Sequence, residues 1–334
     1  MTARTPARHV LIDGNNLLYR TYYVFVTLRE KNGEPPLTSA SGYPTGLIYG
    51  AMSLIADWIG AISRPTKVVL FLDGVPSRRL SMDPDYKKKD EDSTIRLRGN
   101  DLPLRLLDGY EARHDVDILS YVLRLFGVDV YYGADEEADD LIASYVHARP
   151  EDMHVIVSSD RDFYQILADH VVMYRPGVEG SRFFDVERAT EDMKKLAGVP
   201  LPPSHIRMLK SFTGDTSDNI PGVPRLRKKV VASFCHHPDP ASVYSAGLPG
   251  MSKNEHEKTV SMRERVELNY RLVGMESNID LTPFLQPALN DFATGSRILK
   301  EDLQIVGVDT NAFRLQEVGR TIVAPALPDW LVDI

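Results

Sequence analysis

The sequence has little of what marks secreted, membrane or zinc-binding proteins. Its 334 residues include a single cysteine, Cys235, which excludes a disulfide framework and a thiolate zinc site. No apolar run reaches the length that spans a bilayer, and no N-terminal stretch combines basic residues with an apolar core. We therefore expect a soluble intracellular protein without a membrane partner.

The chain also lacks an overall excess of basic residues. Its net charge of −8 argues at first against nucleic acid as a partner, because phosphate binding needs cations. The bases are grouped, however, and a charge run alone is usually a solvated face. The groups are Arg78-Arg79, Lys87-Lys88-Lys89, Arg96 with Arg98, and Arg225 with Arg227-Lys228-Lys229.

Three short apolar runs each end in an aspartate. They are Val10 to Asp13, Val68 to Asp73 and Val155 to Asp160. Short runs rich in β-branched residues are typical of buried strands in a parallel sheet, and the carboxyl ends of such strands line one crevice. Carboxylates gathered there repel one another unless cations hold them, and hard oxygen ligands favour Mg²⁺ or Mn²⁺. The sequence therefore predicts a divalent-metal site.

The wider pattern predicts an α/β fold. Val128 to Tyr132 and Val171 to Tyr174 are two further expected strands, and Leu47 to Ile62 and Val116 to Phe126 have helical spacing. Alternating strands and helices predict a mostly parallel central sheet with helices on both faces, over residues 1–199.

The run from Gly198 to Pro203 indicates a boundary, after which the pattern is mostly helical. We expect a smaller helical region over 200–280 and a C-terminal extension over 281–334 with no assigned role. Residues 85–115 form a charged insertion after the second strand. A solvated excursion is the simpler explanation, but basic residues beside an acidic metal site favour a lid over the crevice that handles the substrate.

Further acids are clustered in three places. The first turn of a predicted helix contains Glu137, Asp139 and Asp140. The helix dipole favours acidic residues in a first turn, which explains some of these acids but not their number. Asp162 follows Asp160 closely. Asp215 and Asp218 share a turn in which an Asx-turn or a helix cap accounts for one aspartate and rarely for both.

Six stretches occur in an order that resembles the 5′-nuclease superfamily. This superfamily contains flap endonucleases, phage 5′–3′ exonucleases and the nuclease domain of bacterial DNA polymerase I. The matching stretches begin at Ile12-Asp13-Gly14-Asn15-Asn16, Leu72-Asp73-Gly74, Asp85-Tyr86-Lys87, Glu137-Ala138-Asp139-Asp140, Ser159-Asp160-Arg161-Asp162 and Gly214-Asp215-Thr216-Ser217-Asp218-Asn219. The set covers residues 9–275.

The resemblance implies two or more Mg²⁺ ions, with Mn²⁺ as a substitute. It assigns the first ion to Asp13, Asp73, Glu137, Asp139 and Asp160, and the second to Asp140, Asp162, Asp215 and Asp218. It implies that Arg20 and Lys87 act on the scissile phosphate and that Tyr86 stacks on a base. The family often has a further basic residue shortly after Lys87, where this sequence has Asp90, and we expect Lys88 or Lys89 to substitute for it. Two metal ions suit in-line phosphodiester hydrolysis.

The turn after the last acidic pair departs from the family pattern. Gly222 is kept, but Arg225 and Arg227 stand where the family has later glycines, whose amides approach duplex phosphate and help to hold K⁺. We expect Arg225, Arg227, Lys228 and Lys229 to grip the duplex instead. A K⁺ site is not assured by this sequence.

The resemblance implies a stand-alone 5′ nuclease of replication or repair that acts on DNA with a 5′ flap, a nick or an RNA primer. No polymerase domain follows, as expected for a phage or accessory bacterial enzyme in the cytoplasm of a bacterial or phage-infected cell. In this interpretation, residues 1–199 are the nuclease core and 200–280 a helix-turn-helix-like duplex-binding region.

Two alternatives remain, a PIN-type ribonuclease and a non-catalytic protein that binds branched DNA. We expect a monomer. Residues Gln286 to Phe292 faintly resemble a sliding-clamp peptide, although chance or local packing explains them better. A clamp or single-strand-binding protein is therefore only a weakly indicated partner.

Overall fold

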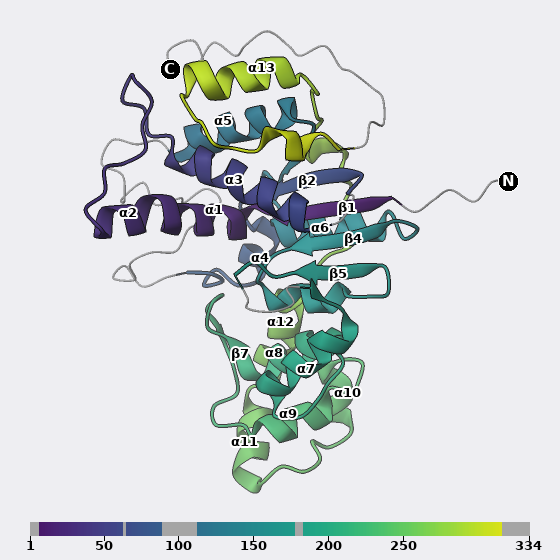
Figure 1. The fold of residues 1–334 in the computed structure, drawn as a ribbon. Coiled ribbons are helices and arrows are strands. Elements are labelled where there is room, and N and C mark those ends of the chain that lie inside the picture. The colour runs from purple at the N-terminus through teal and green to yellow at the C-terminus, as the bar shows by residue number, and fades with distance from the viewer. Residues whose placement is uncertain (1–6, 63–64, 89–111, 178–182, 316–334) are drawn as a thin grey trace, which may run out of the picture. The chain divides into compact units, whose positions relative to one another are not determined.

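The computed structural model describes residues 7–62, 65–88, 112–177 and 183–315 (Figure 1). The chain divides into two compact units. Unit 1 comprises Met1–Val75, Thr94–Ser158 and Asn278–Ile334, and unit 2 comprises Pro76–Ser93 and Ser159–Ser277. This grouping differs from the boundary at residue 199 expected from the sequence, because each unit is made of segments that are not continuous in the chain. The function of residues 1–199 and 200–280 as separate domains remains a prediction.

Unit 1 is built on strands in the order β4-β1-β2-β3-β9. The first four are parallel, and β9 pairs antiparallel with β3. The apolar runs that end at Asp13, Asp73 and Asp160 are β1, β2 and β4, as predicted, and their inner residues are fully buried. The bounds are β1 Arg8–Asp13, β2 Lys67–Leu72, β3 Asp129–Tyr132, β4 Met153–Val157 and β9 Leu285–Gln286.

Helices connect these strands. The two helices predicted from spacing are confirmed as α3 and α5. The chain passes from β1 through β2 to β3 and then returns to β4 on the other side of β1. Since crossovers between parallel strands are right-handed, this reversal of direction is expected to put α6 on the face opposite α3 and α5. The strand order is that of the predicted doubly wound fold. The bounds are α1 Gly14–Tyr22, the π-helical turn η1 Tyr23–Thr27, α2 Leu28–Lys31, α3 Gly46–Ala61, α5 Ala112–Leu125 and α6 Ala138–His147.

The C-terminal extension completes unit 1, which the sequence did not indicate. Figure 1 shows α13 beside α5, and the Phe292 ring meets Phe126 at 5.5 Å between centroids. Leu289 is buried, and its N–H donates to the Arg124 carbonyl at 2.7 Å. Local packing therefore explains the clamp-like segment. The remaining elements are η4 Thr282–Phe284, α13 Phe292–Arg297, η5 Ile298–Asp302 and η6 Thr310–Phe313.

Unit 2 is mostly helical after residue 186, and Gly198, the first residue of the predicted boundary, ends α7 with φ of +77°. β5 pairs antiparallel with β6, and β7 with β8. The bounds are α4 Ser77–Met82, η2 Arg161–Ile166, β5 Val171–Tyr174, β6 Phe183–Phe184, α7 Val186–Ala197, η3 Pro203–His205, α8 Ile206–Thr213, β7 Gly214–Asp215, β8 Ile220–Pro221, α9 Lys228–Phe234, α10 Pro240–Ser245, α11 Lys253–Ser261 and α12 Arg263–Val273. Among the described residues, no helix is long and apolar enough to cross a membrane.

A buried polar network lies near the start of β1. The His9 Nδ1 atom is 3.2 Å from the Tyr145 hydroxyl, and Nε2 is 3.9 Å from Asp152. Burial lowers the pKa of His9 from 6.5 to about 4, although Asp152 opposes the shift. His9 is therefore neutral in the folded protein at pH 7.

This shift predicts a loss of stability in mild acid. Because the unfolded chain binds the His9 proton more tightly, stability that is present above pH 6.5 should fall as the pH approaches about 4. Urea midpoints measured across this window should fall less steeply for His9→Gln than for the wild type. The exposed control His147→Gln should keep the wild-type slope. Equal slopes in all three proteins would contradict the assignment.

Candidate functional site

Backbone and side-chain donors hold two acids of unit 1 at the carboxyl ends of neighbouring strands. Asp13 ends β1 and caps α1, accepting from the Asn16 N–H at 3.1 Å and from the Ser158 hydroxyl at 2.6 Å. Asp73 directly follows β2 and accepts from the Asn15 amide and, at 2.6 Å, from the Ala138 N–H. Both carboxylates are nearly buried. The parallel sheet therefore brings them to one edge, as its topology predicted.

The N-terminus of α6 adds three acids to this edge. Glu137 is the N-cap residue, and Asp139 and Asp140 occupy the first turn. Asp140 is fully buried, Glu137 is nearly so, and Asp139 is half-buried. Since the Ala138 N–H donates to Asp73, the first turn of α6 contacts the acid that follows β2. Metal binding by these five residues of unit 1 remains a prediction.

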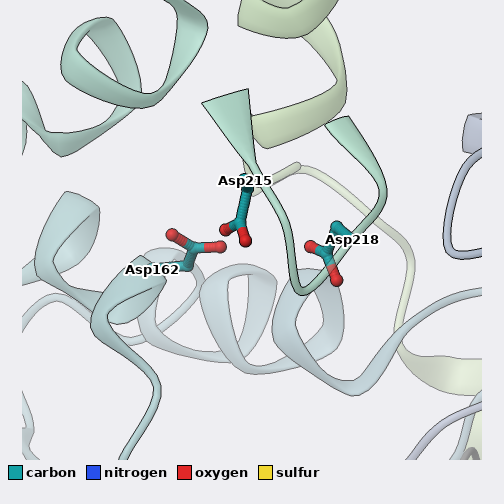
Figure 2. A group of neighbouring side chains, drawn as sticks. All are labelled: Asp162, Asp215 and Asp218. Carbon is teal, nitrogen blue, oxygen red and sulfur yellow. The ribbon is translucent and has the colours of Figure 1, made fainter. Parts of the chain in front are cut away.

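Unit 2 gathers a second carboxylate group, Asp162, Asp215 and Asp218 (Figure 2). One carboxylate oxygen from each residue lies within 4.8 Å of the others. Asp162 lies in η2, whereas Asp215 ends β7 and Asp218 lies in the turn to β8. Asp160 caps η2 by accepting from the Asp162 N–H at 2.9 Å and is exposed. Of the acids predicted in unit 2, the structure thus brings these three closest together.

Lys210, which the sequence did not single out, lies within this carboxylate group. Its ammonium, on α8, forms ion pairs with Asp162 and, at 2.6 Å, with Asp215. Burial and the neighbouring Asp160 raise the pKa of Asp162 to about 7. Burial would also raise the pKa of Asp215, but Lys210 holds it below its usual value. A single lysine on an amphipathic helix gave no signal in the sequence.

Two glycines let the chain form the turn that carries Asp215 and Asp218. A Cβ atom on Gly222 would lie 2.1 Å from the Thr213 carbonyl oxygen, closer than any real contact. Gly214 has φ of +76°, and a Cβ there would meet the Gly222 nitrogen at 2.4 Å. Gly222, predicted to contact DNA, therefore has a steric reason to be glycine.

The basic and aromatic residues proposed from the resemblance have different environments. Lys87 Nζ lies 3.9 Å from Asp218, and Arg20 donates to Asn16 at 2.9 Å. Tyr86 is only 3% exposed, because it packs with Ile220 and residues of α12. In this arrangement Tyr86 cannot stack on a base. Tyr19, next to Arg20, is 46% exposed, so its ring is accessible to solvent whereas the ring of Tyr86 is not.

The basic turn before α9 also differs from the expectation. Arg227 is engaged by Glu255 at 2.7 Å and by the Gly250 carbonyl at 3.0 Å, so it joins the turn to the N-terminus of α11. Arg225 is exposed and has φ of +59°, the left-handed conformation that glycine adopts most easily. Arg225, one of the two arginines at positions where the family pattern has glycine, thus has a backbone conformation typical of glycine. Lys228 and Lys229 are exposed.

The basic residues that follow Tyr86 are only partly described. The Lys88 ammonium forms an ion pair with Asp85 at 2.9 Å. Lys89, Arg96 and Arg98 lie outside the described residues.

We predict that Lys210→Met destabilises the metal-free protein. The change leaves Asp162 and Asp215 close together without their ammonium, and breaking such a buried pair costs about 3 kcal/mol. Urea unfolding in EDTA should show this loss, and added Mg²⁺ should stabilise the variant more than the wild type. Lys195→Met, which removes an exposed lysine, is the control. A wild-type midpoint for Lys210→Met would refute the role of Lys210.

Comparisons with known proteins identify relatives of this chain. The chain is 25% identical over 313 residues to a 5′-3′ exonuclease of Aquifex aeolicus, covering 92% of this chain and 91% of the relative. It is also 25% identical over 285 residues to DNA polymerase I of Borreliella burgdorferi. That match covers 85% of this chain but only 28% of the polymerase. The solved structure of phage T5 D15 flap endonuclease, described as a complex with DNA and metal ions, has a TM-score of 0.58 at 19% identity and covers 92% of this chain and 96% of its own. This last likeness shows a shared fold.

A known protein family matches the N-terminal part of the chain. Residues 8–194, more than half of the sequence, match the family described as the 5′-3′ exonuclease N-terminal, resolvase-like domain. This match includes the four parallel strands of unit 1, β1 to β4, together with η2. The chain therefore belongs to the 5′-3′ exonuclease family.

Proposed function

We propose that the protein is a Mg²⁺-dependent 5′ nuclease that hydrolyses phosphodiester bonds near junctions of single- and double-stranded DNA. The observation that carries this proposal is the close approach of Asp162, Asp215 and Asp218 in a chain of the 5′-3′ exonuclease family. The resemblance to flap endonucleases favours DNA with a 5′ flap, a nick or an RNA primer. The T5 protein, of the same fold, is described with DNA and metal ions bound.

The carboxylates of unit 2 fit a divalent cation. Three oxygens within 4.8 Å of one another form a hard, anionic donor set, and the Lys210 ammonium already provides positive charge there. We assign Asp162, Asp215 and Asp218 of unit 2 to one ion and Asp13, Asp73, Glu137 and Asp139 of unit 1 to another. The resemblance alone adds Asp140 to the former group and Asp160 to the latter. Such ions supply Lewis-acid stabilisation of the charge on the phosphate and activation of water.

The protein's own cations complement this chemistry. Lys87 and Arg20 would donate charge-assisted hydrogen bonds to the phosphate oxygens, which become more negative in the transition state. Lys210 would compensate Asp162 and Asp215 while no divalent ion is bound. Backbone N–H groups, such as that of Ala138, hold the acceptor oxygens in fixed directions. The site would thus be organised before substrate arrives.

The duplex-binding role of the basic turn remains part of the proposal. Arg225, Lys228 and Lys229 are exposed and could contact phosphates, whereas Arg227 is held by Glu255 and is better suited to support the turn. The exposed ring of Tyr19 is a better candidate than Tyr86 for stacking on a base.

Cleavage of an end-labelled 5′-flap DNA tests the function. We expect product with Mg²⁺ and none with EDTA. Asp160→Asn should abolish cleavage but retain DNA binding, since the change removes no phosphate contact. Asp169→Asn removes an exposed acid of unit 2 and should leave the rate unchanged.

Three outcomes would count against this proposal. DNA binding without cleavage in the wild type would favour the non-catalytic alternative. Full activity of Asp160→Asn at saturating Mg²⁺ would show that this carboxylate does not serve the reaction. Cleavage of single-stranded RNA in preference to flap DNA would favour the PIN-type ribonuclease.

A further inference from the structure

The segment Asp83–Lys88 is attached to the turn that carries Asp215 and Asp218, which we call the acidic turn (Gly214–Pro221). Both belong to unit 2. The Lys87 N–H donates to the Asp218 carbonyl at 2.8 Å, and the Asn219 side-chain amide donates to the Asp85 carbonyl at 2.9 Å. These two hydrogen bonds run in opposite directions and cross-link the two stretches over neighbouring residues.

Packing supports the same attachment. The Tyr86 ring lies in a buried cluster with Ile220, the residue that follows Asn219, and with Leu272 and Val273 of α12. The Lys87 ammonium lies 5.4 Å from the centre of the Tyr86 ring. The buried ring thus anchors the backbone on which Lys87 stands.

The backbone at both ends of the cross-link is unusual. Lys87 has φ of +53° and Asn219 has φ of +57°. A left-handed conformation is unfavourable for lysine, and asparagine tolerates it best among residues with a Cβ. Lys87 therefore needs surrounding contacts to hold it there, and its hydrogen bond to Asp218 is one of them.

We propose that Asn219 is a positioning residue for the Lys87 ammonium. Asn219 ties the Asp85 carbonyl to the acidic turn, and this fixes the direction in which Lys87 leaves the backbone. Lys87 Nζ then lies 3.9 Å from the Asp218 carboxylate, close enough to act with it and too far for a direct hydrogen bond. The proposal rests on the proposed function, in which Asp218 serves a metal ion and Lys87 acts on the phosphate.

Two substitutions separate the amide of Asn219 from its backbone conformation. Asn219→Gly permits φ of +57° and removes the hydrogen bond to Asp85. Asn219→Asp keeps the shape and turns an acceptor oxygen toward the Asp85 carbonyl, so it should be the more damaging change. Gln304→Gly is the matched control, because Gln304 is exposed in unit 1 and has φ of +51°.

The kinetic test is a double-mutant cycle with Lys87→Ala. Under single-turnover conditions with saturating Mg²⁺, Asn219→Gly should lower the cleavage rate about tenfold, and DNA affinity measured with Ca²⁺ should stay within about twofold. In the Lys87→Ala background the same change should cost less than about twofold. Gln304→Gly should have the wild-type rate. If the fall in cleavage rate in the double mutant equalled the product of the falls in the two single mutants, the proposal would be overturned. A wild-type cleavage rate in Asn219→Gly would also overturn it.

Amide hydrogen exchange tests the same inference without cleavage. In Asn219→Gly the Lys87 N–H should exchange at least tenfold faster, whereas amides inside α12 should keep their protection. Unchanged protection at Lys87 would overturn the proposal even if the wild type proved inactive on DNA. Absence of Mg²⁺-dependent cleavage in the wild type, with faster exchange at Lys87, would refute the proposed function and leave the positioning role supported.

Discussion

Repulsion between carboxylates held close together is the constraint on which this structure depends. In unit 2, oxygens of Asp162, Asp215 and Asp218 lie within 4.8 Å of one another. At an effective dielectric constant of about 20, each such pair of charges costs roughly 3–4 kcal/mol. A fold that keeps these groups together without a compensating cation would lose much of the 5–15 kcal/mol that typically stabilises a protein.

The structure offsets this cost with fixed donors and with one lysine. In unit 1, N–H groups of Asn16 and Ala138 and the hydroxyl of Ser158 donate to Asp13 and Asp73. In unit 2, Lys210 pairs with two of the three carboxylates. These donors orient the oxygens and leave negative charge for an ion. The arrangement that costs stability in the metal-free protein is therefore the one expected of the proposed divalent-metal site.

Local patterns were sufficient to predict the parallel sheet and the positions of most acids. Asp13 and Asp73 end strands because apolar runs precede them, and parallel pairing then brings them to one edge. Contacts between residues distant in sequence were not predictable in this way. Lys210 meets Asp162 because α8 packs on η2, and β9 joins the sheet through two residues that have no strand pattern of their own.

The basic and aromatic residues show that a resemblance in sequence does not always carry a residue's role with it. Tyr86 matches an aromatic of the family but is buried against α12, and Arg227 is held by Glu255. Neither contact is visible in a motif, because each partner lies far away in the sequence. Arg225, in contrast, has a left-handed backbone at a position where the family has glycine. The backbone there has a conformation that glycine adopts most easily, although the residue is arginine.

The most direct test of the account is a count of the divalent ions that the protein binds without DNA. Electron paramagnetic resonance of Mn²⁺ titrated into the wild type should show saturable binding that Mg²⁺ displaces. Replacing Asp215 and Asp218 together by asparagine should remove at least one of the bound ions, whereas Asp169→Asn should remove none. Absence of saturable Mn²⁺ binding to the wild type, or an unchanged count in the double variant, would contradict the claim that these carboxylates are gathered to hold a metal.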